Sequence, residues 1–193
     1  MQQPRNIYHV MRHGHSEANA AGIIVSGPGT GVSGYGLSAR GLDEVRRALR
    51  EQSVLSSDCR IVSSDFLRAR QSAELVHNSL QCNFPVRCDE RLRERWFGNH
   101  DGGSADAYPR VWEQDVLDPG HRRENVESVN DVHERVTRLL MDLESEASGE
   151  NFLLVAHGDV LQILLAVCAG RPASEHRSIT HLETAEIRSV VFG

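Results

Sequence analysis

One uninterrupted apolar run limits the folds open to this chain more than any other feature. Residues 152–156 read Phe-Leu-Leu-Val-Ala, and the run ends abruptly in His157-Gly158-Asp159. A strand without polar alternation is typical of the centre of a parallel sheet that helices cover on both faces. We therefore expect an α/β protein with this strand near the middle of its sheet.

Strands and helices alternate along the rest of the chain, as the spacing of apolar residues indicates. Further strands are expected near residues 6–10, 60–64, 85–88 and 184–191, and helices over residues 38–52, 65–80, 106–116, 127–148 and 160–169. Repeated strand-then-helix order predicts right-handed βαβ units around a mainly parallel sheet.

The expected architecture is a three-layer α/β/α sandwich with a mainly parallel central sheet. Residues 1–193 are predicted to form a single domain, with a small cap insertion at about 99–125, where apolar periodicity is weak. Residues 22–36 contain six glycines and one proline, a composition that predicts a loop. Ser128 and Asp131 have the spacing of a capping box at the start of a helix, and Asp65 or Ser64 is expected to cap the helix over residues 65–80.

Composition excludes several classes of function. The net charge of −6 argues against nucleic acid as a partner. All 21 basic residues are arginine, so a phosphate-binding or Schiff-base lysine is excluded. The longest apolar stretch, Val160–Ala169, contains Gln162 and is too short to cross a bilayer. Without a signal-peptide pattern, we expect a cytoplasmic protein with no membrane partner.

The cysteines and histidines do not show the spacing of a metal site. The four cysteines form no Cys-x-x-Cys pair, which argues against zinc and against a disulfide framework. His13 and His15 could be two metal ligands, but Arg12 would place a cation beside the metal. We therefore predict neither a metal nor a cofactor.

Four separate segments place reactive side chains directly after predicted strands, where open α/β sheets bind their ligands. These segments are Arg12-His13-Gly14, Arg68, Glu94 and His157-Gly158. Two imidazoles, two guanidinium groups and a carboxyl group suit in-line attack on a phosphate. One imidazole would be the nucleophile, the cations would stabilise the equatorial oxygens, and the carboxyl group would protonate the departing oxygen.

The same segments resemble the motifs of the histidine phosphatase superfamily, the phosphoglycerate mutase-like group. Single motifs are weak signals, but here they occur in the family's order over nearly the whole chain. The matching segments are Arg12-His-Gly-His-Ser-Glu-Ala-Asn19, Leu37-Ser-Ala-Arg-Gly41, Ser63-Ser-Asp-Phe-Leu-Arg-Ala-Arg-Gln-Ser-Ala-Glu74, Leu92-Arg-Glu94 with Phe97-Gly98, Glu127-Ser128 and Ala156-His157-Gly158.

The resemblance implies a role for each matching residue. His13 would be the nucleophile that forms a phosphohistidine, and Glu94 would be the proton donor. Arg12, Arg68 and His157 would hold the phosphoryl group. Asn19 and the Gly158 amide would assist. Other carboxyl groups also come into question as the acid, namely Glu17, Asp101 and Asp159.

The sequence leaves open which residues would contact the part of the substrate beyond the phosphoryl group. Arg122 and Arg123 could bind a substrate carboxylate or a second phosphate, or lie in a solvated loop, and both interpretations stay open. Three aromatic residues could line the pocket or pack in the cap; they are Trp96, Tyr108 and Trp112. The chain departs from the family pattern at residues 22–36, 99–102 and 126, all expected near the substrate.

The preferred interpretation is a metal-independent histidine acid-type phosphatase that hydrolyses a small-molecule or sugar phosphate. Family mutases carry a long insertion between the acid and the last histidine, whereas here Glu94 and His157 are only about 60 residues apart. The alternatives are a cofactor-dependent phosphoglycerate mutase, a protein phosphohistidine phosphatase and a phosphate-binding module without turnover. The oligomeric state is open, with a homodimer among the expectations.

Overall fold

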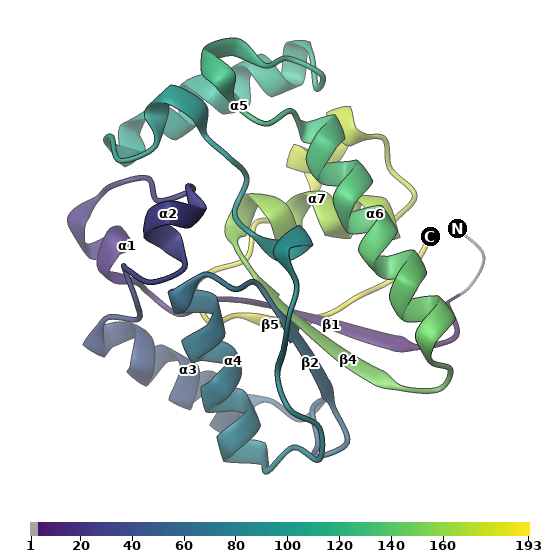
Figure 1. Cartoon of the computed structure of the whole chain (residues 1–193). Helices are drawn as coiled ribbons and strands as arrows, with labels where there is room; N and C mark the ends of the chain where they lie inside the picture. The colour runs from purple at the N-terminus through teal and green to yellow at the C-terminus, as the bar shows by residue number, and fades with distance from the viewer. Residues whose placement is uncertain (1–3) are drawn as a thin grey trace.

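A five-stranded sheet forms the centre of the molecule, in the order β3-β2-β4-β1-β5. The computed structural model describes residues 4–193 (Figure 1). Strand β4 is central and pairs in parallel with β1 and β2; β3 pairs in parallel with β2, and only β5 is antiparallel. The strands are β1 (Ile7–Arg12), β2 (Arg60–Ser63), β3 (Arg87–Cys88), β4 (Asn151–Ala156) and β5 (Ile187–Ser189). The predicted mainly parallel sheet is confirmed.

Helices cover both faces of this sheet, as the apolar run in β4 predicted (Figure 1). Phe152, Leu154 and Ala156 pack with helices α6 and α7, whereas Leu153 and Val155 face α3 and α4. The helices are α1 (Glu17–Ala21), α2 (Pro28–Gly31), α3 (Ala39–Glu51), α4 (Leu67–Leu80), α5 (Tyr108–Leu117), α6 (Val129–Glu146) and α7 (Gly158–Cys168). The α/β/α layering is therefore as expected.

Helix α6 shows how sequence and packing agree. Ser128 caps it, and its side chain and that of Asp131 form the predicted capping box. Six apolar side chains of α6 are buried against the sheet and α7, each worth about 1.5–3 kcal/mol of transfer free energy. Packing of that face therefore outweighs the cap, which contributes about 1 kcal/mol.

The start of α4 differs from the prediction that Ser64 or Asp65 would cap it. The helix begins at Leu67, after an extended Phe66 that makes no side-chain cap. Asp65 instead forms an ion pair with Arg93, with Oδ2 and Nη2 2.6 Å apart. A tertiary contact thus takes the carboxylate that the local pattern assigned to the helix end. Residues 22–36 also differ from a plain loop, because they contain the short helix α2.

Residues 99–125, which we call the cap segment, leave the sheet and carry helix α5 (Figure 1). A small apolar cluster of Ile24, Phe97, Val111 and Val126 joins this segment to the loop after α1. No helix within residues 4–193 is long and apolar enough to cross a membrane.

A buried ion pair also attaches the cap segment. Arg95 is fully buried, and its two terminal nitrogens each lie 2.7 Å from a carboxylate oxygen of Asp115 on α5. The same guanidinium lies 3.4 Å from Asp159 on α7, and His121 contacts Asp115 at 2.8 Å. Because a buried charge without a partner is strongly destabilising, this network holds α5 close to the carboxyl ends of the strands.

Candidate active site

Strand register places the two histidines next to each other. Arg12 at the end of β1 pairs with Ala156 at the end of β4, so the residues that follow, His13 and His157, leave the sheet at the same level. Their ring centroids are 5.1 Å apart, and the ring planes meet at 63°. Both side chains are buried. Two segments separated by more than 140 residues therefore meet at one rim of the sheet.

The contacts of His13 determine which of its nitrogens is free to react. Nδ1 lies 2.8 Å from the carbonyl oxygen of Gly14, which only accepts hydrogen bonds. Nδ1 therefore carries the proton, and Nε2 keeps its lone pair. The Nε of Arg68 donates to this Nε2 at 3.1 Å. Burial and the charges of Arg68 and Arg12 hold the pKa of His13 well below its usual value, so the ring is neutral.

Three buried nitrogen atoms around His13 have no hydrogen-bond partner. They are Arg12 Nε, Arg68 Nη1 and His157 Nδ1, three of the five such side-chain atoms within residues 4–193. Leaving a buried donor unpaired costs about 1–3 kcal/mol, and more for a charged group. Two guanidinium groups and an imidazole with unused donors at one place form a site for an anion with several oxygens.

Other contacts hold these donors in place. Arg12 Nη1 donates to the carbonyl of Leu182 at 2.8 Å and lies 2.9 Å from His181 Nε2. Arg68 Nη2 donates to the carbonyl of Val25 at 2.9 Å. Each guanidinium is therefore held by the protein and still has at least one nitrogen left for a ligand. Such preorganised donors stabilise negative charge that develops on a ligand in the transition state.

Glu94 has the properties of a proton donor. Burial raises its pKa to about 7, and the charge of Asp159 adds to the rise, while Arg68 opposes it. Its Oε1 accepts a hydrogen bond from the backbone of Arg95 at 2.9 Å, and its Oε2 lies 3.9 Å from His157 Nδ1. A carboxyl group with a pKa near neutrality can both give and take a proton at physiological pH.

The other carboxyl groups considered from the sequence have different environments. Asp101 accepts hydrogen bonds from the backbone of Ser26 and Gly27, which holds the loop after α1. Asp159 lies within ion-pair distance of Arg95 and Arg177, and its pKa is lowered, chiefly by Arg177 against the effect of burial, so it stays ionised. Glu17 is exposed at the start of α1. Glu94 is the best suited of the four.

The catalytic pocket, as we call it, is a cavity of about 130 Å³ beside His13, Arg12 and Arg68. Two further residues predicted for phosphate binding line it, Asn19 and Gly158. Glu94 lines this pocket and also a cavity of about 590 Å³, so the two spaces meet at that side chain.

Aromatic residues of the cap segment form one wall of the catalytic pocket. Tyr108 and Trp112 both line it, with their rings stacked at 5.4 Å and 16°. Trp112 Nε1 donates to Asp159 at 3.3 Å, and the Arg177 guanidinium lies 4.2 Å from the Trp112 ring centroid. Trp96, considered with them in the sequence, lies elsewhere.

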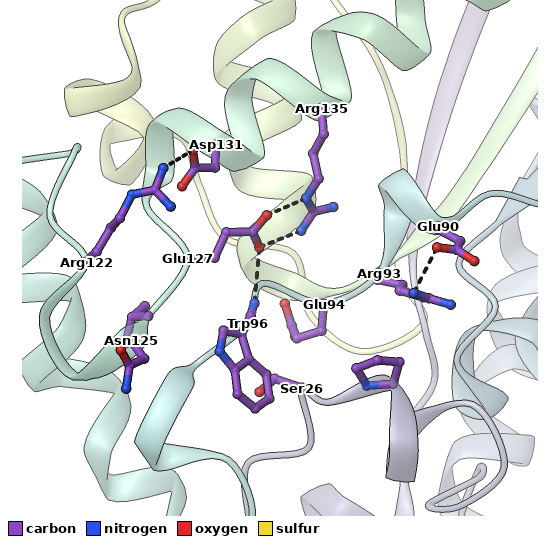
Figure 2. Close-up of a pocket in the computed structure, with 12 residues that line it drawn as sticks. Ser26, Glu90, Arg93, Glu94, Trp96, Arg122, Asn125, Glu127, Asp131 and Arg135 are labelled. Atoms are coloured by element: carbon purple, nitrogen blue, oxygen red, sulfur yellow. Dashed lines mark hydrogen bonds and ion pairs between the residues drawn. The ribbon is translucent and has the colours of Figure 1, made fainter.

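Arg122 and Arg123 do not lie in the catalytic pocket. Arg122 pairs with Asp131 at 2.7 Å and lines a larger cavity of about 590 Å³, which Trp96 also borders (Figure 2). Arg123 hydrogen-bonds Gln114. The turn at residues 123–125 that follows has Glu124 in the left-handed conformation, with φ 54°. The position of Arg122 and Arg123 depends on how the cap segment folds back, which the order of residues along the chain does not show.

Sequence reasoning also missed residues that border the site. Two of them, Asp159 and His181, line the catalytic pocket. Arg177 lies next to it and donates a hydrogen bond to Asp159. Asp159 follows His157-Gly158 and was considered only as an acid. His181 and Arg177 belong to the segment before β5, whose apolar pattern carries no motif. Their contacts with Arg12 and Asp159 depend on the chain returning across the sheet.

A known protein family matches almost the whole of this chain. Residues 8–193 match the family described as the histidine phosphatase superfamily (branch 1). The chain belongs to the histidine phosphatase superfamily. This confirms the family suggested by the motifs, and the match covers almost the whole of the described chain.

Relatives within this superfamily carry different names. A Photorhabdus laumondii protein named "Probable phosphoglycerate mutase GpmB" is 32% identical over 89% of this chain and 78% of its own length. The adenosylcobalamin/alpha-ribazole phosphatase of Escherichia coli (strain K12) is 26% identical over 85% of this chain and 79% of its own. Among solved structures, Bacillus stearothermophilus YhfR gives a TM-score of 0.78 over 97% of this chain and 94% of that chain, at 23% identity. Proteins named as mutases and proteins named as phosphatases therefore both occur among the relatives of this chain.

Proposed function

We propose that this protein is a metal-independent phosphomonoesterase that hydrolyses a small-molecule or sugar phosphate through a phosphohistidine on His13. One observation carries the proposal: the lone pair of a neutral His13 Nε2 lies among buried donors that have no partner. An anion bound by those donors would present its phosphorus to Nε2. Names of relatives support the class of reaction, since phosphatases occur among them.

The chemistry takes two steps. In the first, Nε2 of His13 forms a bond to phosphorus while the bond from phosphorus to the ester oxygen breaks, and Glu94 gives its proton to that oxygen. In the second, a water oxygen attacks phosphorus and the bond to Nε2 breaks. Glu94, now a carboxylate, takes the proton of the water, and phosphate leaves.

Arg12, Arg68 and His157 act throughout by donating to the phosphoryl oxygens. Charge on these oxygens is shared with preorganised donors, and no reorganisation is needed in the transition state. The nucleophile stays neutral because burial, and after it the same guanidinium groups, oppose its protonation. The cations therefore serve both substrate binding and activation of the histidine.

The test measures release of phosphate from p-nitrophenyl phosphate by the wild type and by His13→Ala, each with and without a chelator. We expect turnover by the wild type that the chelator does not change, and none above background by the variant. Rapid quench with ³²P-labelled substrate should trap acid-labile label on the wild type. Loss of turnover with chelator, or binding without turnover, would contradict the proposal. A panel of phosphorylated metabolites would then identify the substrate.

A phosphoglycerate mutase is the second candidate, because mutases occur among the relatives that are more than 30% identical. A mutase must retain a bisphosphate and exclude water while the bisphosphate reorients, whereas Glu94 here lines both the catalytic pocket and a second cavity of about 590 Å³. Isomerisation of 3-phosphoglycerate, stimulated by 2,3-bisphosphoglycerate and faster than phosphate release, would favour the mutase. A peptide carrying phosphohistidine tests the protein-phosphatase alternative in the same assay.

A further inference from the structure

We propose that Ser64 is a positioning residue that sets the tautomer of His157, so that this histidine donates a hydrogen bond to the phosphoryl group through Nδ1. The inference rests on the proposed function, in which His157 holds that group. Ser64 follows β2 and is fully buried. Its side chain contacts Nε2 of His157, while Nδ1 of the same ring has no hydrogen-bond partner.

The hydrogen bonds around Ser64 leave one acceptor for its hydroxyl proton among the described residues. Oγ of Ser64 accepts a hydrogen bond from the backbone of Phe66 at 3.2 Å. The same Oγ lies 3.0 Å from His157 Nε2. Within the part of the chain that the structure describes, this nitrogen is the only acceptor found for the hydroxyl. Because a buried donor is rarely left unpaired, the hydroxyl donates to Nε2.

A proton on Nδ1 of His157 follows from that bond. A ring nitrogen that accepts a hydrogen bond has its lone pair free, and a neutral imidazole carries its one proton on the other nitrogen. Burial and the charge of Arg68 lower the pKa of His157 well below its usual value, which keeps the ring neutral. The reverse tautomer would leave the serine proton without an acceptor and turn a lone pair toward the phosphoryl oxygens.

The two histidines thus share a tautomer but present opposite edges to the substrate. His13 has its Nδ1 proton bound to the Gly14 carbonyl and offers the Nε2 lone pair. His157 has its Nε2 lone pair bound to Ser64 and offers the Nδ1 proton. The Gly14 carbonyl, which only accepts, therefore makes His13 the nucleophile. The Ser64 hydroxyl, which can donate, makes His157 the hydrogen-bond donor.

The test reads the tautomer directly, without reference to activity. Long-range ¹H–¹⁵N correlation spectra of protein labelled at histidine distinguish a protonated ring nitrogen from one with a lone pair, and His157→Asn assigns the signals. We expect the wild type to carry the proton on Nδ1 of His157. Ser64→Ala should show a mixture or the Nε2-protonated form. Ser63→Ala is the matched control, because Ser63 is equally buried and its hydroxyl donates to the Ser64 carbonyl.

Binding of orthovanadate, which imitates the transferred phosphoryl group, supplies a second measurement. Loss of one donor to a charged ligand predicts affinity about 10- to 100-fold weaker for Ser64→Ala and little change for Ser63→Ala. A proton on Nε2 of His157 in the wild type would overturn the inference, and this result needs no variant to fold. So would an unchanged tautomer in Ser64→Ala. Neither result would affect the proposed hydrolysis, which wild-type phosphate release tests separately.

Discussion

The rings of His13 and His157 lie 5.1 Å apart at an angle of 63°, although the two residues follow different strands. This arrangement comes from parallel pairing of β1 with β4, in which Arg12 lies beside Ala156. It brings the lone pair of His13 Nε2 close to His157, whose Nδ1 has no hydrogen-bond partner. A phosphoryl group between them would meet a nucleophile and a donor together.

Replacing His13 with asparagine should remove the covalent step while the fold remains. We expect kcat/KM for p-nitrophenyl phosphate to fall by roughly 10³-fold or more, since the variant lacks the imidazole that accepts the phosphoryl group in the proposed mechanism. Orthovanadate should still bind through the remaining donors. Trapped label on the variant after rapid quench would show that another residue is the nucleophile.

Replacing Glu94 with glutamine should affect poor leaving groups most, because they depend on protonation. Loss of the acid predicts roughly 10²- to 10⁴-fold slower hydrolysis of an alkyl phosphate and a smaller loss for p-nitrophenyl phosphate. The wild-type rate with the alkyl ester should fall as pH rises through about 7, because the protonated acid is then lost. Equal losses for both esters would exclude Glu94 as the proton donor.

The raised pKa of Glu94 also predicts how stability depends on pH. The folded protein keeps this proton up to about pH 7, whereas the unfolded chain releases it near 4.5. Stability is therefore lost as pH rises from about 4.5 to 7, by up to about 3 kcal/mol for the shift given. Glu94→Gln should remove this dependence and be more stable than the wild type at pH 8 but not at pH 4.5. Urea unfolding at both pH values measures it, with exposed Glu134→Gln as the control.

The buried pair between Arg95 and Asp115 should matter far more to stability than an exposed pair. Asp115→Ala leaves a fully buried guanidinium that keeps its Nε hydrogen bond to the Glu127 carbonyl but has a carboxylate no nearer than Asp159 at 3.4 Å, and we expect a loss of about 3–5 kcal/mol. Glu134→Ala removes the partner of Arg138 on the surface of α6 and should cost at most about 1 kcal/mol. Similar losses for both variants in urea unfolding would show that the Arg95 network does not hold the cap segment.

Much of the fold followed from local patterns because those patterns report burial. The apolar run of β4 predicted a central strand, and the spacing of valines and leucines predicted α6 with its cap at Ser128. Boundaries were less accurate where tertiary contacts compete with local ones. Asp65 pairs with Arg93 instead of capping α4, and the last strand is shorter than predicted because only Ile187–Ser189 pair with β1.

The sequence by itself determined which strand ends carry the reactive residues, because the order of motifs and the apolar periodicity place them after strands of a parallel sheet. Only the tertiary structure decided their chemical state. The pKa of Glu94, the lone pair of His13 and the position of Arg122 outside the catalytic pocket depend on burial and on partners far along the chain. Charge and proton position respond to every neighbour within a few ångströms, and those neighbours are assembled only when the chain folds.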